Sequence, residues 1–208
     1  ATHSLTSTTE NATSSGTLAS AILAGVSWAD VDTGALSGLA ITAVTGSGTW
    51  QYSTDGNTWA NFGAVTSTNA LLITSTTQVR YIPSTQNAET ATFSFKAWDQ
   101  TSGTASTNGT PSYATTASSG GTTAFSSSNA TASMSVTAVN DAPTITDSAI
   151  YTLTSTTEDA TSSGTLASTI LGGVSWGDVD TGALSGLAIT AVTGSGAWQF
   201  STDGSTWA

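Results

Sequence analysis

The chain has 208 residues and a formal net charge of −11, with 13 acidic and only 2 basic residues, a single histidine and no cysteine. Two cations cannot form the basic patch that binds nucleic acid or an anionic membrane surface, so we expect neither partner. We also expect no enzymatic activity, because a Ser-His-Asp arrangement would depend on His3, and the matching position of an internal repeat holds Tyr151.

Short β-strands are predicted along most of the chain, because apolar and polar residues alternate with a period of two. The segment 18–26 suits a helical turn or a strand equally well. The expected strands are residues 39–44, 49–53, 58–62, 70–73, 78–82, 92–98 and 131–139. Asp55-Gly56 lies between two of them and is typical of a hairpin turn. Many short strands with frequent turns predict an all-β sandwich.

Residues 100–129 are rich in serine, threonine and glycine. This low complexity predicts a long connection between two strands, with short irregular pairing and a mobile backbone.

The sequence repeats itself at a constant offset of 148 residues. Residues 1–60 match residues 149–208 without a gap, and 50 of the 60 pairs are identical. This period is far longer than the roughly 20–50 residues of a solenoid repeat, so each copy is expected to be a domain. Arrays of near-identical domains usually provide reach, spacing or multivalency.

The boundary between the two domains is expected near residues 139–143, which read Val-Asn-Asp-Ala-Pro. Pro143 cannot donate a ladder hydrogen bond and favours an extended Ala142, so a strand should end here. Residues 1–141 then form a nearly complete domain, and residues 142–208 form the first part of another. The second part would expose unpaired strand edges unless further chain or a neighbouring molecule covers them.

The stretch AVNDAPTIT at residues 138–146 resembles the junctions of bacterial cadherin-like and immunoglobulin-like tandem repeats. Such repeats occur in giant surface proteins, including repeats-in-toxin-type adhesins. TGSGTWQYSTDGNTWANFG at residues 45–63, followed by VRYIP and FSFKAWDQTSG, is similar to a repeat type found in the same proteins. The resemblance implies Greek-key β-sandwich domains in tandem, located outside the cell or on a bacterial surface.

The resemblance also implies calcium at the joints between domains, bound by oxygen ligands from separate loops. The ligands expected at the joint within this chain are Asn140, Asp141, Glu158, Asp178 and Asp180, with Asp99 from the preceding domain. Glu10, Asp30 and Asp32 occupy the equivalent positions of the first copy and are expected to serve the joint before residue 1. The alternative is that these acidic residues only form Asx-turns and loop starts.

The aromatic residues around the expected hairpin allow two interpretations. Trp50, Tyr52, Trp59 and Phe62 could stack on sugars, as in a carbohydrate-binding module, or fill the core of the sandwich. The replacement of Tyr52 by Phe200 in the second copy favours the core, because the hydroxyl is then dispensable.

The sequence therefore predicts a structural or adhesive repeat that acts as a spacer in a large bacterial surface protein, with joints stiffened by calcium. The expected partners are neighbouring repeats of the same protein. Two other functions remain open: a self-assembling filament, sheath or surface-layer subunit that associates laterally, and a carbohydrate-binding module.

Overall fold

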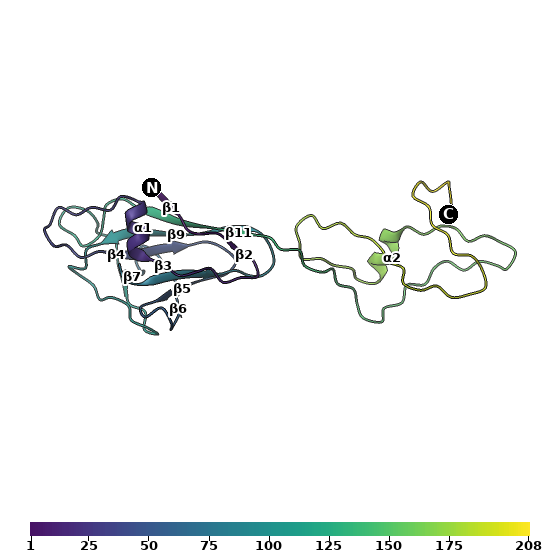
Figure 1. The fold of residues 1–208 in the computed structure, drawn as a ribbon, viewed down its shortest axis with the longest axis horizontal. Coiled ribbons are helices and arrows are strands. Elements are labelled where there is room, and N and C mark those ends of the chain that lie inside the picture. Colours follow the sequence, from purple (N-terminus) through teal and green to yellow (C-terminus); the bar gives the residue numbers. More distant parts are fainter. The chain divides into compact units, whose positions relative to one another are not determined.

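A computed structural model describes residues 1–208, which divide into two compact units, Ala1–Val139 and Asn140–Ala208 (Figure 1). This division lies two residues before the boundary expected after Asp141. The elements of the first unit are β1 (Thr2–Ser4), β2 (Thr8–Thr9), β3 (Thr17–Leu18), α1 (Ala19–Gly25), β4 (Gly38–Val44), β5 (Thr49–Ser53), β6 (Ala60–Asn61), β7 (Ala70–Thr74), β8 (Gln78–Ile82), β9 (Glu89–Trp98), β10 (Tyr113–Ala114) and β11 (Ala130–Thr137).

The strands form two sheets, which confirms the predicted all-β class. The seven-stranded sheet has the order β1-β11-β9-β4-β7-β10, and β2 pairs with the same strand, β11, as β1 does. The four-stranded sheet has the order β3-β8-β5-β6. Most pairs are antiparallel, but β1 and β2 both run parallel to β11. The arrangement is consistent with a β-sandwich.

A single core lies between the two sheets, and alternation along the strands determines which residues enter it. Phe93 and Phe95 point inward from β9, and Phe93 meets Trp50 of β5. The rings of Phe93 and Trp50 are in edge contact at 4.9 Å between centroids, a favourable geometry for aromatic pairs. Trp50 is 4% exposed and Tyr52 is fully buried, so the prediction that they fill the core is confirmed.

A second apolar cluster covers the other face of the seven-stranded sheet. Ala40, Ala70 and Leu72 alternate with the inward-facing residues of β4 and β7, so they point away from the main core. They pack with Trp98 of β9 and with Phe125, which lies in the segment 100–129. This segment is therefore anchored on the sheet, because Trp98 offers a large apolar surface for it. The predicted short pairing within it is present as β10, which pairs with β7.

Helix α1 resolves the ambiguous segment 18–26. Ala19, Ile22 and Leu23 are buried, a spacing of three and four residues that places all three on one face of a helical turn. The apolar face packs against the main core. The helix is only seven residues long, which explains why the periodicity alone did not distinguish it from a strand.

The hairpin turn between β5 and β6 is fastened by the side chain of Asp55. Its Oδ1 accepts hydrogen bonds from the backbone N–H groups of Asn57 and Thr58, at 2.8 and 2.7 Å, and from the hydroxyl of Ser53. These bonds hold residues 55–58 in a turn, so the expected strand at 58–62 is shortened to Ala60–Asn61.

Acid is expected to weaken this turn. The N–H groups of Thr58 and then Asn57 lower the pKa of Asp55 from 3.8 to about 2. A lowered pKa in the folded state adds stability that is complete above pH 4 and is lost as the pH falls through about 2. Thermal melting should therefore show Asp55→Ala less stable than the parent at pH 7, with most of that difference lost at pH 2. Asp203 makes the same turn in the second unit, so Asp203→Ala should leave the melting of the first unit unchanged at both pH values.

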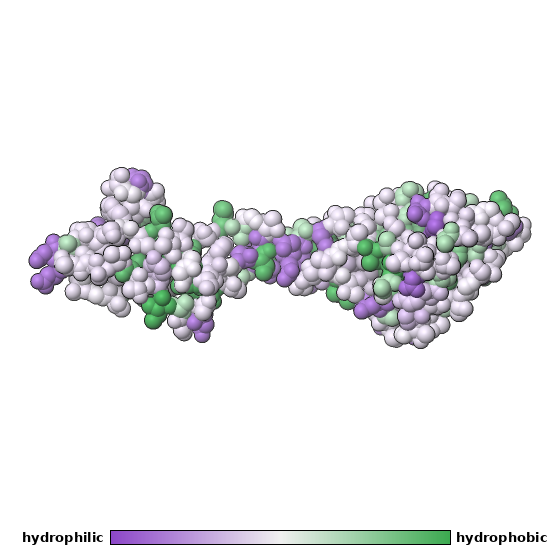
Figure 2. Space-filling model, turned by 180° about the vertical axis from the view of Figure 1, so that it is seen from behind, coloured by the Kyte–Doolittle hydropathy of each residue, from purple (hydrophilic) through white to green (hydrophobic).

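The second unit contains one regular element, helix α2 (Ala167–Gly173), and an isolated bridge between Thr144 and Gly177. Residues 186–192 and 197–201, the counterparts of β4 and β5, form no strands. In the first unit those strands pair with β7, β8 and β9, and residues 140–208 contain no counterpart of these three. As a result Trp198 and Phe200 are 61% and 66% exposed, and apolar patches appear on the surface of this unit (Figure 2, left).

Neither helix is long and apolar enough to cross a membrane.

Candidate metal-binding residues

Glu10 follows β2 directly in the sequence. In space it lies beside Thr137 and Val139, the last residues of the first unit. Its backbone N–H donates to the carbonyl of Thr137 at 3.0 Å, and its Oε1 accepts the N–H of Val139 at 2.6 Å. The side chain is fully buried, and Oε2 has no hydrogen-bond partner. A buried carboxylate oxygen without a partner is unfavourable unless water or a cation occupies the place beside it.

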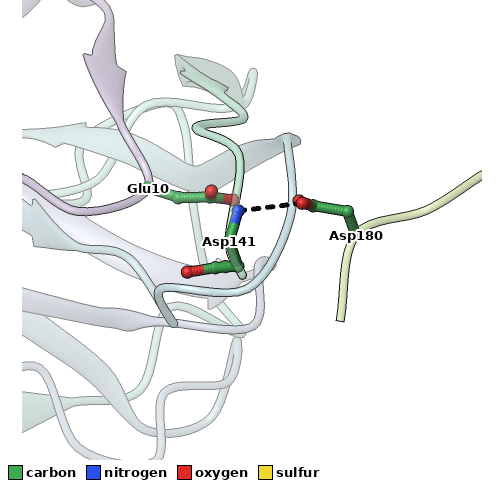
Figure 3. Close-up of side chains that lie close together, drawn as sticks. All are labelled: Glu10, Asp141 and Asp180. Carbon is green, nitrogen blue, oxygen red and sulfur yellow. Dashed lines mark hydrogen bonds between the residues drawn. The ribbon is translucent and has the colours of Figure 1, made fainter. Parts of the chain in front are cut away.

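Two aspartates that are far apart in the sequence meet in the second unit. The backbone N–H of Asp141 donates to Oδ2 of Asp180 at 2.9 Å, a bond drawn in Figure 3, where Glu10 of the first unit is also labelled. Asp141 Oδ2 is buried and has no partner. The backbone of Asp180 in turn donates to Oδ1 of Asp178 at 2.9 Å. The junction aspartate is thus held by the Asp-x-Asp loop that follows α2, and both belong to the predicted ligands.

The Asp-x-Asp loop has the same local structure in both copies. Asp30 Oδ1 accepts the N–H of Asp32 at 2.9 Å, as Asp178 accepts that of Asp180. This is an Asx-turn, so turn formation alone accounts for one oxygen of Asp30 and of Asp178. It does not account for the buried oxygen of Glu10.

Asp99 lies at the opposite end of the first unit from Val139. In the antiparallel pair of β9 and β11, Phe95 is opposite Ala130 and Glu89 is opposite Val136. The residue after β9 is therefore beside the start of β11, far from its end. The expectation that Asp99 joins the junction residues does not agree with this register. Asp99 instead lines the same pocket as Asp30, and its Oδ1 accepts two hydrogen bonds from Thr101.

Neither Glu10 nor Glu158 has the surroundings expected from the sequence. Glu10 was expected at the joint before residue 1, yet it is bonded to Val139 at the end of its own unit. Glu158 was expected beside Asn140 and Asp141, but its side chain is exposed. The physical reason is the parallel pairing of β2 with β11, which carries the residue after β2 to the end of the unit. Asn140 is exposed, and its side chain donates to the Asp141 carbonyl at 2.8 Å.

Glu89 is a further carboxylate near the end of β11, but its oxygens are already engaged. Oε1 accepts the Tyr81 hydroxyl at 2.6 Å and Oε2 accepts the Ser47 N–H at 2.7 Å. Burial raises the pKa of Glu89, but these hydrogen bonds outweigh it and lower the pKa overall. Glu89 therefore fastens the loop between β4 and β5, which is a structural role.

The aromatic residues of the hairpin offer little surface for a sugar. Trp50 and Phe62 are buried in the main core. Trp59 is half-buried, and the guanidinium of Arg80 lies 4.0 Å from the centre of its ring, so one face of the indole is covered. No observation in the first unit favours carbohydrate binding.

No known family model, curated protein or solved structure matches this chain.

Proposed function

We propose that the chain is part of a tandem array of β-sandwich domains, of the Greek-key cadherin-like or immunoglobulin-like type, that acts as a spacer in a large bacterial surface or secreted protein. The observation that carries this proposal is the agreement between the repeat and the compact unit. The first unit ends at Val139, and the counterpart of Ala1 is Ala149. The 148-residue period therefore consists of one compact domain and a short connection, as expected of domains joined end to end.

Calcium at the junction is the second part of the proposal. Its ligands would be Asp141 and Asp180, with Asp178 beside them and Glu10 from the preceding domain. Val139 and Asp141 are separated by one residue, so their Cα atoms lie within about 7 Å of each other in any arrangement of the two units. Because Glu10 is hydrogen-bonded to Val139, its carboxylate stays near the junction. Carboxylate oxygens gathered from separate loops are the ligands that calcium prefers.

The buried, unpartnered oxygens of Glu10 and Asp141 support a cation more than turn chemistry does. Turns explain the Asp-x-Asp loops in both copies, but they leave these two oxygens without a role. A bound calcium ion would satisfy both oxygens and would offset the repulsion among carboxylates in a chain of net charge −11. It would thereby restrict bending between domains.

Thermal melting of the chain in excess EGTA and in millimolar calcium tests the proposal. At ten times Kd, one bound ion stabilises the folded state by about 1.4 kcal/mol, so we expect the first unit to melt several degrees higher in calcium. Glu10→Gln should abolish this rise, because it keeps the acceptor for the Val139 N–H but removes the charge. Glu158→Gln is the matched control and should preserve the rise.

The two Asp-x-Asp loops provide a second matched pair of variants. Asp178→Asn with Asp180→Asn should remove the calcium response. Asp30→Asn with Asp32→Asn should keep it, because the Asn-Asp-Ala-Pro junction occurs once in the chain, at residues 140–143. Equal melting of the parent in EGTA and in calcium would contradict the calcium site and leave turn formation as the role of these residues.

Lateral self-association is a second candidate function, favoured by the exposed aromatic side chains of the second unit. Trp198, Phe200 and Trp207 are all exposed there, and exposed aromatic side chains can contribute to an interaction surface. Sedimentation velocity over a hundredfold range of concentration distinguishes the two functions. A spacer stays monomeric, whereas an assembling subunit forms concentration-dependent oligomers or fibres.

A further inference from the structure

The C-terminal part of the first unit, residues 61–139, has two nearly identical partner segments within one chain. In the first unit it pairs with residues 1–60: β7 and β9 with β4, β8 with β3 and β5, and β11 with β1 and β2. Residues 149–208 repeat the sequence of residues 1–60 and leave their own apolar side chains exposed. The segment 61–139, which completes the sandwich, thus has two nearly identical sequences in the chain with which its strands can pair.

The substitutions between the two partner segments lie mostly outside the buried contacts with residues 61–139. The counterpart of β4, residues 186–192, is identical to it in sequence. Nine of the ten substituted positions are exposed or half-buried in the first unit, and only Tyr52 is buried. Its replacement, Phe200, keeps the ring and loses one hydrogen bond, from the Tyr52 hydroxyl to the Thr107 carbonyl at 3.1 Å. Residues 149–208 can therefore fill the same core.

The connection between the segments is long enough for this pairing. In an alternative sandwich made of residues 61–208, Ile150 would take the place of Thr2, which is opposite Thr131 in β11. The chain would have to return from Thr137 along six residues of β11, about 20 Å. Thirteen residue steps separate Thr137 from Ile150, and they reach about 43 Å when extended. Parallel strands need a crossover of about a dozen residues, and this connection meets that need.

We infer that residues 61–139 can exchange partners within one chain. In the exchanged form they leave residues 1–60 and complete the sandwich with residues 149–208. Both forms contain the same core, and the tether keeps the competing segment at a high effective concentration. In a tandem array, such an exchange would shift the boundaries between domains along the sequence by part of a repeat. The number of completed cores would stay the same. The inference does not depend on calcium or on the spacer role.

Disulfide trapping in the full chain tests the exchange, because the chain contains no cysteine. Gln51 and Arg80 are directly paired and half-buried, so cysteines there can form a cross-strand disulfide. Gln199 is the counterpart of Gln51. A variant with Gln51→Cys, Arg80→Cys and Gln199→Cys is unfolded, refolded at low concentration, oxidised and mapped by proteolysis. Disulfide 51–80 reports the form described above, and disulfide 80–199 within a monomer reports the exchanged form.

We expect disulfide 80–199 in at least about a tenth of the cross-linked chains, because mostly exposed substitutions shift an equilibrium by about tenfold or less. A share below about one in a hundred would overturn the inference. Disulfide 80–199 found only in covalent dimers would also overturn it, because the donor would then be a second copy. Disulfide 51–80 in the variant without Gln199→Cys establishes that the cysteines permit folding.

Two glycines allow the equilibrium to be biased in opposite directions. A Cβ at Gly48 would collide with the carbonyl oxygen of Ile82 and would lie 2.8 Å from Cα of Pro83, both in the exchanging segment. A Cβ at Gly196, its counterpart, meets nothing within 4 Å. Gly48→Ala should therefore disfavour the pairing of residues 61–139 with residues 1–60 and raise the share of disulfide 80–199. In the exchanged form Gly196 takes the place of Gly48, so Gly196→Ala should disfavour that form and lower the share. An unchanged share in both variants would show that the 80–199 disulfide does not arise from the inferred pairing.

Discussion

Replacement of Phe93 by alanine is expected to lower the free energy of unfolding of the first unit by about 3–5 kcal/mol. Phe93 is fully buried at the centre of the main core. Its ring contacts those of Trp50, Phe62 and Phe95 at centroid distances of 4.9, 5.7 and 5.9 Å. Alanine would remove all three contacts and leave a cavity between the sheets, which rigid strands can close only in part.

Urea-induced unfolding followed by far-ultraviolet circular dichroism measures this effect. Trp198→Ala is the control, because Trp198 is 61% exposed and its loss should change the stability by no more than about 0.5 kcal/mol. Phe93 lies in the segment common to both pairings, so partner exchange cannot rescue the variant. A loss below about 1 kcal/mol would contradict the aromatic core described here.

The strands that the sequence predicts best are those defined by local signals. β5 and β8 have the predicted bounds, since each alternates strictly and each is bordered by a turn. The Asp55-Gly56 turn was found for the same reason: Asp55 bonds to residues two and three positions away, and Gly56 has the positive φ of 76° that such turns require. Interactions of this kind are contained within a few residues and can be read from a short stretch of chain.

The elements that the sequence does not predict depend on distant partners. β1 and β2 are strands only because β11, about 130 residues away, offers a free edge to them. Their sequences, rich in threonine and serine, show no apolar alternation that would indicate a buried face. The same long-range pairing decides that Glu10, and not Glu158, is hydrogen-bonded to Val139. Composition and spacing contain no signal for it.

In the candidate site, too, the sequence predicts what local motifs determine and misses what distant strand pairing determines. Asp141, Asp178 and Asp180 were grouped from their motifs, and hydrogen bonds connect Asp141 to Asp180 and Asp180 to Asp178. Asp99 was assigned to the junction because it ends a strand, but a strand has two ends and only its pairing shows which one faces the junction. The register of β9 with β11 places it at the other end of the unit.

Replacement of Trp98 by alanine is expected to lower the free energy of unfolding by about 3–5 kcal/mol and to release the segment 100–129. Trp98 is 1% exposed, and its indole N–H donates to the carbonyl of Ser102 at 2.7 Å. It also lies in the apolar cluster that holds Phe125. The serine, threonine and glycine residues of this segment contribute few apolar contacts of their own, so its attachment should depend strongly on this one side chain.

Limited proteolysis separates this effect from a general loss of stability. Chymotrypsin should cleave Trp98→Ala after Tyr113 and Phe125 under native conditions, faster than it cleaves the parent. Phe93→Ala damages the main core on the other face of the sheet. When the two variants are equally destabilised, chymotrypsin should cleave a smaller fraction of Phe93→Ala than of Trp98→Ala at these two sites. Trp207→Ala removes a 44% exposed indole and should leave the cleavage of the segment unchanged. Equal cleavage of Trp98→Ala and the parent at these sites would contradict this role of the indole. Hydrogen bonds would then hold the segment, such as those that Lys96 Nζ donates to the carbonyls of Ser126 and Ser127 at 3.0 and 2.9 Å.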